Sequence, residues 1–342
     1  MPAEARTQVI KSEDPASKPP STANSSRDRS RFSMGDSLLA DRAFQAVIIA
    51  CVVALLAIVG LILYELTIAS SLSVHKFGFR FLAKSIWDPV AEDFGALPFI
   101  YGTLVSSLLA LLIAVPLSMG TALFITELCP RWLRSPLSLC VELLAAIPSV
   151  IYGLWGIFVL APLMRVYVQP FLAKYMSWTG LFSGPKYGYG MLAAGVVLAV
   201  MVLPYITSVT REVITAVPTQ QREAVLALGA TPWEMLRLAV LRNARVGIFG
   251  AIILGLGRAL GETMAVTMLI GNRPEIARSL FAPGYTLASV IANEFTEATS
   301  DMYLSALVEM ALILFALTLI VNAIARLLVW SITRGMPARG LA

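Results

Sequence analysis

The chain alternates between long apolar runs and shorter segments rich in polar and charged residues. Six apolar runs are each long enough to cross a hydrocarbon core of about 30 Å as a helix. They cover residues 43–67, 100–128, 137–164, 187–210, 246–270 and 303–330. The third run is interrupted by Glu142 and Pro148. This pattern predicts an all-α polytopic membrane protein with six transmembrane helices.

Composition supports a membrane protein and argues against several other classes. Hydrophobic residues make up 58% of the chain, charged residues 14%, and the mean hydropathy is +0.78. The formal charge of +5 does not indicate a nucleic-acid partner, because the basic residues cluster in some inter-span segments and not in others. The three cysteines have no metal-ligand spacing, and neither a metal nor a cofactor is predicted. The sequence Gly-x-x-x-x-Gly-Lys does not occur, so this chain is not expected to hydrolyse ATP itself.

The polar segments divide the chain into regions. Residues 1–35 are rich in Ser, Pro and charged residues, which predicts a disordered N-terminal tail. The region 36–99 is interpreted as a first transmembrane helix followed by an extracytoplasmic segment. Aromatic residues in 69–99 predict a helix that lies on the membrane surface. A five-helix core at 100–330 and a short C-terminal tail at 331–342 complete the chain.

The distribution of Lys and Arg predicts the orientation. One set of inter-span segments, with both termini, holds seventeen of these residues, and the opposite set holds eight. The positive-inside rule therefore places both termini and the segment 211–245 in the cytoplasm.

The segment 211–245 has the signals of two short helices joined at a glycine. Pro218-Thr219 begins the first helix, and Gly229 is placed as a C-terminal capping residue. Thr231-Pro232-Trp233-Glu234 is a capping-box sequence that begins the second. The segment is interpreted as a docking element for another protein, or as an interfacial hairpin without a partner. A DNA-binding helix-turn-helix is sterically awkward between two spans.

Two opposite charges occur within the fifth apolar run. Arg258 is about 18 Å from Val246 at 1.5 Å per residue, near the middle of the span. Glu262 follows four residues later, a spacing that puts both side chains on one helix face. The pair either pins this helix to its neighbours or forms a step for an anion, because a guanidinium offers phosphate two parallel hydrogen bonds. Glycines surround it at positions 255, 257 and 261.

Other polar positions in the spans have more than one interpretation. Glu142 and Glu309 are either protonated or paired with polar groups of a partner. Pro148 frees backbone groups, so Ser149 and Tyr152 beside it are candidate pathway hydroxyls; a simple proline kink is the alternative.

Several motifs resemble one transporter family. Glu223-Ala224-Val225-x-x-x-Gly229 resembles the Glu-Ala-Ala-x-x-x-Gly loop of bacterial ATP-binding-cassette (ABC) importer permeases. Val225 replaces the second alanine, and Arg242 stands where that family usually has proline. The strings at 94–104, 147–153 and 255–265 are similar to the phosphate-importer branch, the C-type permeases of Pst phosphate uptake systems. The string Gly-Arg-Ala-Leu-Gly-Glu-Thr-Met-Ala at 257–265 is the most specific of them.

The resemblance implies a type I ABC importer permease fold and the import of inorganic phosphate across a bacterial cytoplasmic (inner) membrane. It implies that the loop residues Glu223, Ala224, Val225 and Gly229 couple to the ATPase. It also implies that Arg258 and Glu262 act in the anion pathway, for which Ser149 and Tyr152 are further candidates. The implied partners are a paralogous second permease, two ATP-binding subunits and an extracytoplasmic phosphate-binding protein. We further infer that Glu262 holds Arg258 until substrate competes for it.

Alternatives remain open at this point. The chain could import another oxyanion, such as molybdate or sulfate. It could be an ATP-independent secondary transporter, although no clear inverted repeat is present and the docking segment would then be idle. A membrane enzyme is disfavoured, because the only histidine, His75, is in a loop and no cluster of His, Asp and Glu is present.

Overall fold

A computed structural model describes residues 34–333, with side chains over 41–331. Over these residues the regular secondary structure is helical, apart from an isolated bridge between Asp88 and Asp93. The N-terminal tail that was predicted to be disordered covers residues 1–35. Residues 1–33 lie outside the described residues, and residues 34 and 35 begin α1. Most of the predicted C-terminal tail, residues 334–342, also lies outside them.

The chain divides into two units, Met1–Val59 and Gly60–Ala342, and the boundary falls within helix α1 (Met34–Ala69). In the first unit, every described side chain of α1 is exposed, although nearly all of them are apolar from residue 43 onward. An apolar helix without a buried face is suited to a lipid environment. The predicted region boundaries after residues 99 and 330 remain predictions.

The number of spans is confirmed, because six described helical stretches are long and apolar enough to cross a membrane. They are Asp41–Ala69, Leu97–Leu128, Ser149–Tyr175, Met191–Thr215, Pro232–Leu260 and Asp301–Ser331. The predicted bounds of the third span, 137–164, are wrong. Helix α5 (Arg131–Ala146) ends before Pro148, and the spanning stretch begins at Ser149 and continues to Tyr175, beyond the predicted end at residue 164.

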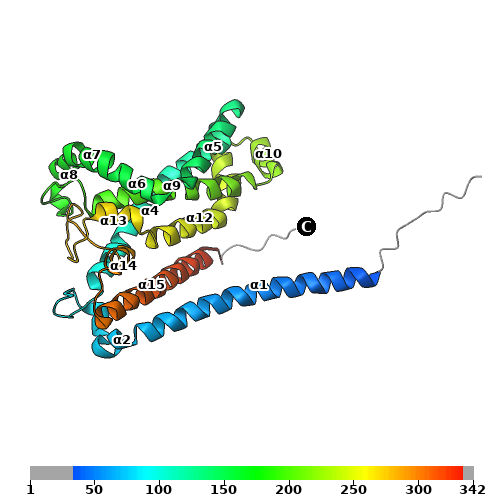
Figure 1. Cartoon of the computed structure of the whole chain (residues 1–342). Coiled ribbons are helices and arrows are strands. Elements are labelled where there is room, and N and C mark those ends of the chain that lie inside the picture. Colours follow the sequence, from blue (N-terminus) through cyan, green and yellow to red (C-terminus); the bar gives the residue numbers. More distant parts are fainter. Residues whose placement is uncertain (1–33, 334–342) are drawn as a thin grey trace, which may run out of the picture. The chain divides into compact units, whose positions relative to one another are not determined.

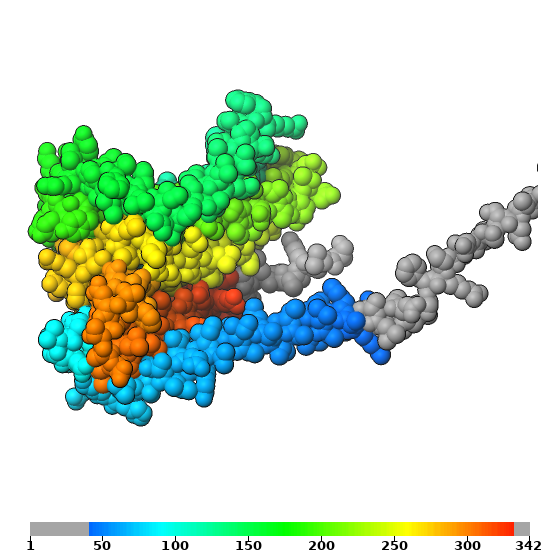
Figure 2. Space-filling model, viewed as in Figure 1, coloured from blue at the N-terminus to red at the C-terminus, as the bar shows by residue number. Residues whose placement is uncertain are grey.

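The core of the second unit is built around α9 (Met191–Thr215), the most buried of the six candidate spans. It packs on α4 (Leu97–Leu123), α5 and α12 (Arg242–Leu260). Helix α12 also contacts α15 (Asp301–Thr333). In Figures 1 and 2 the yellow segment of α12 and α13 (Met264–Ile270) therefore lies between the green helices and the orange to red end of the chain.

The segment after α1 differs from the predicted surface helix. It forms two short helices, α2 (Ser71–Phe77) and α3 (Arg80–Ala83), and α2 packs on α15. Phe81 and Phe94 are fully buried in this region. The Trp87 ring lies 4.7 Å from Phe94 between centroids, and the Phe94 ring stacks on Tyr303 at 5.4 Å. The aromatic residues therefore pack on one another within the fold, although Phe79 remains exposed.

Two carboxylates within the apolar runs find partners inside this chain. Glu142 of α5 pairs with Arg211 of α9 at 2.8 Å. Glu309 of α15 is buried and accepts a hydrogen bond from the Ser73 hydroxyl of α2 at 2.5 Å. Both carboxylates thus link helices of this chain, which accounts for them without a second permease.

We predict that Gly102 of α4 tolerates no side chain. Helix α14 (Leu287–Glu294) docks there, with the Leu287 amide donating to the Thr103 hydroxyl at 2.9 Å. A Cβ at Gly102 would collide with the backbone carbonyl of Tyr285, which cannot rotate away. Gly102→Ala should therefore destabilise the protein by about 1–3 kcal/mol. The measurement is the midpoint of thermal unfolding in mild detergent.

Gly120 is the matched control, because it lies in the same helix and a Cβ there meets no atom within 4 Å. Gly120→Ala should leave the midpoint unchanged or raise it, since alanine favours a helix interior over glycine. An equal midpoint for the two variants would contradict the proposed docking of α14.

Candidate functional site

The apolar run that was predicted as the third span is broken at Ile147–Pro148, and two tyrosines stabilise the break. Both residues are extended, and α6 (Ser149–Trp155) begins directly after them. The break releases carbonyls at the end of α5 from helical hydrogen bonds. The Tyr152 hydroxyl donates to the Leu144 carbonyl at 2.8 Å, and the Tyr205 hydroxyl of α9 donates to the Ala145 carbonyl at 2.8 Å. Both carbonyls are therefore satisfied away from water.

Arg258, near the end of α12, lies against the same tyrosine. Its guanidinium carbon is 4.2 Å from the centroid of the Tyr205 ring, a cation–π geometry. Its Nε is buried without a hydrogen-bond partner. Within the described part of the chain, Arg258 has no hydrogen bond or ion pair. The stacked guanidinium is thus held in place, and no carboxylate of the described residues compensates its charge.

Glu262 does not pair with Arg258, contrary to the geometry expected from a continuous fifth span. Helix α12 ends at Leu260, and Gly261, Glu262 and Thr263 are not helical. The spacing of four residues therefore does not place the two side chains on one face, and no ion pair joins them among the described residues. A Glu262 carboxylate oxygen is instead 3.4 Å from the Ala265 amide in the first turn of α13. Because glycine is a poor helix former, ending α12 before Gly261 costs little free energy.

Helix α6 follows the break at Ile147–Pro148, and α13 follows a second break, the non-helical residues 261–263. These two helices run in the same direction, side by side. Gly153 of α6 faces α13, where a Cβ would lie 2.5 Å from the Met268 sulfur and 3.2 Å from the Ala265 Cα. Gly156, three residues later, faces Leu269. The starts of α6 and α13 are therefore neighbours. N-terminal ends of discontinuous helices carry partial positive charge and recur at anion sites in membrane transporters.

The predicted pathway residues have different environments. Ser149 is half-buried at the first position of α6, and among the described residues its hydroxyl has no hydrogen-bond partner. Tyr152 is buried, and its hydroxyl is engaged with Leu144. Tyr205, which connects Arg258 to the first break, was not among the predicted site residues. The signal was a tyrosine after Pro204 inside an otherwise apolar span.

The segment between the fourth and fifth spans forms as predicted. Helix α10 (Thr219–Ala227) is followed by Gly229 at φ +85°, a conformation that favours glycine. Thr231 and Glu234 form the predicted capping box at the start of α11 (Pro232–Met235). Glu223, Ala224 and Gly229 are exposed, Val225 is partly buried, and Leu228 is 88% exposed. These residues (Glu223, Ala224, Val225, Leu228 and Gly229) are called the elbow. The elbow thus presents a small, largely apolar surface to the outside of the fold.

The inner side of α10 is fixed to three spans. A guanidinium nitrogen of Arg222 lies 2.9 Å from a Glu127 carboxylate oxygen. The two groups form an ion pair without the alignment of a hydrogen bond. Arg222 also donates to the Ile214 carbonyl at the end of α9 at 2.8 Å. Asn243, at the start of α12, donates to Gln221 at 2.6 Å. A force on α10 is therefore transmitted to the ends of the second, fourth and fifth spans.

Comparisons with known proteins agree with this architecture. Residues 114–334 match the family model described as "Binding-protein-dependent transport system inner membrane component". A phosphate transport system permease protein PstC of Mesorhizobium japonicum is 48% identical over 308 residues, 88% of this chain and 93% of the relative. The protein of the same name from Haemophilus influenzae is 48% identical over 78% of this chain and 86% of the relative.

A solved structure shows the fold. A bacterial ABC transporter involved in the import of alginate superimposes with a TM-score of 0.55 at 18% identity, over 85% of this chain and 98% of the other. The described chain is a multi-pass helical membrane protein with the type I ABC importer permease fold. It belongs to the binding-protein-dependent transport system inner membrane components and, among them, to the phosphate transport system permease proteins PstC.

Proposed function

We propose that inorganic phosphate crosses the membrane along the face of this chain where Arg258 meets the two broken helices. As a member of its family, the chain is a permease subunit of a phosphate importer. The observation that carries the proposal is the stacked guanidinium of Arg258, which has no carboxylate partner among the described residues. A partly buried cation within an apolar span is costly unless an anion arrives to compensate it.

The surrounding groups suit an oxyanion. Arginine stays protonated at any physiological pH and offers a planar fork of donors to phosphate oxygens. Ser149 adds a hydroxyl at the start of α6, and the neighbouring start of α13 adds partial positive charge. In this proposal Tyr152 and Tyr205 stabilise the break between α5 and α6, and Tyr205 also positions Arg258.

Glu262 belongs to the same pathway in the proposal, with a role that changes during transport. In this conformation its carboxylate is near the start of α13. Because Gly261 adjoins it, a rotation at 261–263 would let the carboxylate reach Arg258 when no anion is bound. Phosphate and Glu262 would then alternate as partners of one guanidinium.

ATP hydrolysis drives the transport and takes place in partner subunits. The exposed elbow of Glu223, Ala224, Val225, Leu228 and Gly229 docks on an ATP-binding subunit, supported by its exposure and by the ties of α10 to three spans. The full importer contains a related second permease, two ATP-binding subunits and an extracytoplasmic phosphate-binding protein. In this proposal the elbow and both termini lie on the cytoplasmic side of a bacterial inner membrane, as the distribution of basic residues predicts.

The experiment is uptake of labelled phosphate by cells that lack their own high-affinity permease and express this chain with its partner subunits. We expect uptake that unlabelled phosphate abolishes and that molybdate and sulfate in large excess leave unchanged. Uptake should also disappear when the ATP-binding subunit is omitted. Inhibition by molybdate or sulfate would instead assign the pathway to another oxyanion, and uptake without the ATP-binding subunit would identify a secondary transporter.

A further inference from the structure

A groove runs along the exposed face of α12, between α9 and α15. Two adjoining cavities of about 580 and 640 Å³ form it, and they share Ile253, Leu254 and Arg326. One extends toward Val246 and Trp330, and the other extends toward Gly257. Glycines make room for the groove: a Cβ at Gly250 would meet no atom within 4 Å, and one at Gly257 would meet only the Asn322 side chain at 3.9 Å.

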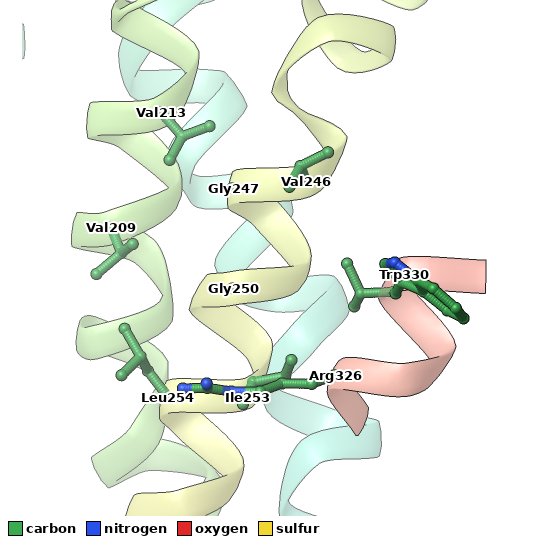
Figure 3. Close-up of a pocket in the computed structure, with 10 residues that line it drawn as sticks. Val209, Val213, Val246, Gly247, Gly250, Ile253, Leu254, Arg326 and Trp330 are labelled. Carbon is green, nitrogen blue, oxygen red and sulfur yellow. The ribbon is translucent and has the colours of Figure 1, made fainter. Parts of the chain in front are cut away.

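The groove is apolar with a single charge. Arg326 is the only charged residue among the described residues that line the two cavities. Figure 3 shows its side chain reaching from α15 across α12, with the guanidinium beside Ile253 and Leu254. Within the described part of the chain it has no hydrogen bond or ion pair. Trp330, one turn later in α15, lies at the end of the candidate span, where tryptophans occupy the level of lipid headgroups.

The length of the groove distinguishes between possible occupants. From Val246 to Gly257 it follows α12 for about 17 Å, which is close to half of a hydrocarbon core of about 30 Å. That length suits the acyl chain of a lipid in one leaflet, whereas a helix of a neighbouring subunit would extend across both leaflets. An apolar helix would also leave Arg326 without an anionic partner, and a lipid phosphate supplies one.

We propose that this groove binds an anionic phospholipid, with its phosphate at Arg326 and an acyl chain along the glycine-containing face of α12. Basic pockets between transmembrane helices are known to bind anionic headgroups. The site differs from the proposed phosphate pathway, because none of its lining residues is Arg258, Tyr205 or a residue of the two breaks.

The test uses the complete transporter complex, purified and titrated with phosphatidylglycerol and with phosphatidylcholine, with bound lipid counted by native mass spectrometry. The wild type should bind phosphatidylglycerol preferentially. Arg326→Gln should reduce that preference by about fivefold, the effect of one cation near an anionic surface. Gly250→Phe fills the groove from its floor and should reduce binding of both lipids.

Arg237→Gln is the matched control, because Arg237 is exposed and lies outside the groove. It should leave the preference unchanged. An unchanged preference in Arg326→Gln would overturn the proposal. It would also be overturned if Gly250→Phe released the second permease from the complex without reducing lipid binding, because the groove would then hold a subunit helix.

Discussion

Arg258→Gln should reduce phosphate uptake by about 100-fold or more while the transporter complex still assembles. Hydrogen bonds to a charged group contribute about 1.5–3 kcal/mol each, and the guanidinium offers phosphate two of them. Their loss corresponds to about two to four powers of ten, at roughly 1.4 kcal/mol per tenfold. Glutamine is also neutral, so the positive charge beside the starts of α6 and α13 disappears. The measurement is initial uptake of labelled phosphate, normalised to the amount of complex in the membrane.

Three variants make the result specific to the guanidinium. Arg258→Lys keeps the charge but loses the planar fork and the stacking on Tyr205, so uptake should fall to an intermediate value. Tyr205→Phe keeps the ring under Arg258 and should cost less than Arg258→Lys. Arg165→Gln removes an exposed arginine elsewhere and should have no effect. Normal uptake by Arg258→Gln would make Arg258 a structural charge and remove it from the pathway.

Leu228→Asp should uncouple this chain from its ATP-binding subunit. Leu228 is 88% exposed beside the elbow at Gly229, the position of an apolar anchor for a docking groove. Burying a carboxylate in such a groove costs at least as much as losing an interface hot spot, about 2 kcal/mol or more. The concentration of ATP-binding subunit that gives half-maximal transport in proteoliposomes should therefore rise by about 30-fold or more. The fold should persist, because Leu228 packs on little of this chain.

The control places the same charge at the other end of the same helix. Thr219→Asp puts a carboxylate in the first turn of α10, where the helix dipole favours it, nine residues from Leu228. It should bind the ATP-binding subunit normally. If Leu228→Asp also bound it normally and supported full uptake, the docking role of the elbow would be wrong.

The features that the sequence predicted well depend on local chemistry. Six spans follow from apolar runs whose length matches the hydrocarbon core, because the backbone within lipid must satisfy its own hydrogen bonds. The elbow of the coupling segment follows from Pro218, Gly229 and the capping box at Thr231 and Glu234. Each of these signals acts between residues a few positions apart, so the neighbouring sequence contains nearly all the energy terms involved.

The two helix breaks could not be predicted in the same way. Hydropathy is nearly the same for a broken and an unbroken apolar run. The run 246–270 therefore gave no clear sign of an interruption, and Pro148 in the run 137–164 was equally compatible with a simple kink. Whether a break at Pro148 is tolerable depends on donors for the released carbonyls, and one of these is Tyr205, sixty positions from Ala145 along the chain. The separation of Arg258 from Glu262 follows from the second break, which moves Glu262 away from the expected helix face.

The sequence by itself thus determined the number of spans and the two-helix form of the segment 211–245, and it marked Arg258 as a candidate pathway residue, because these rest on length, local capping and the cost of a charge in an apolar run. Only the tertiary structure decided how that arginine is held and what its neighbours are. Stacking on Tyr205, the parallel packing of α6 and α13, and the pairing of Glu142 with Arg211 join residues far apart in the chain. Such contacts exist only after the helices have packed, since their free energy depends on distances that no local pattern specifies.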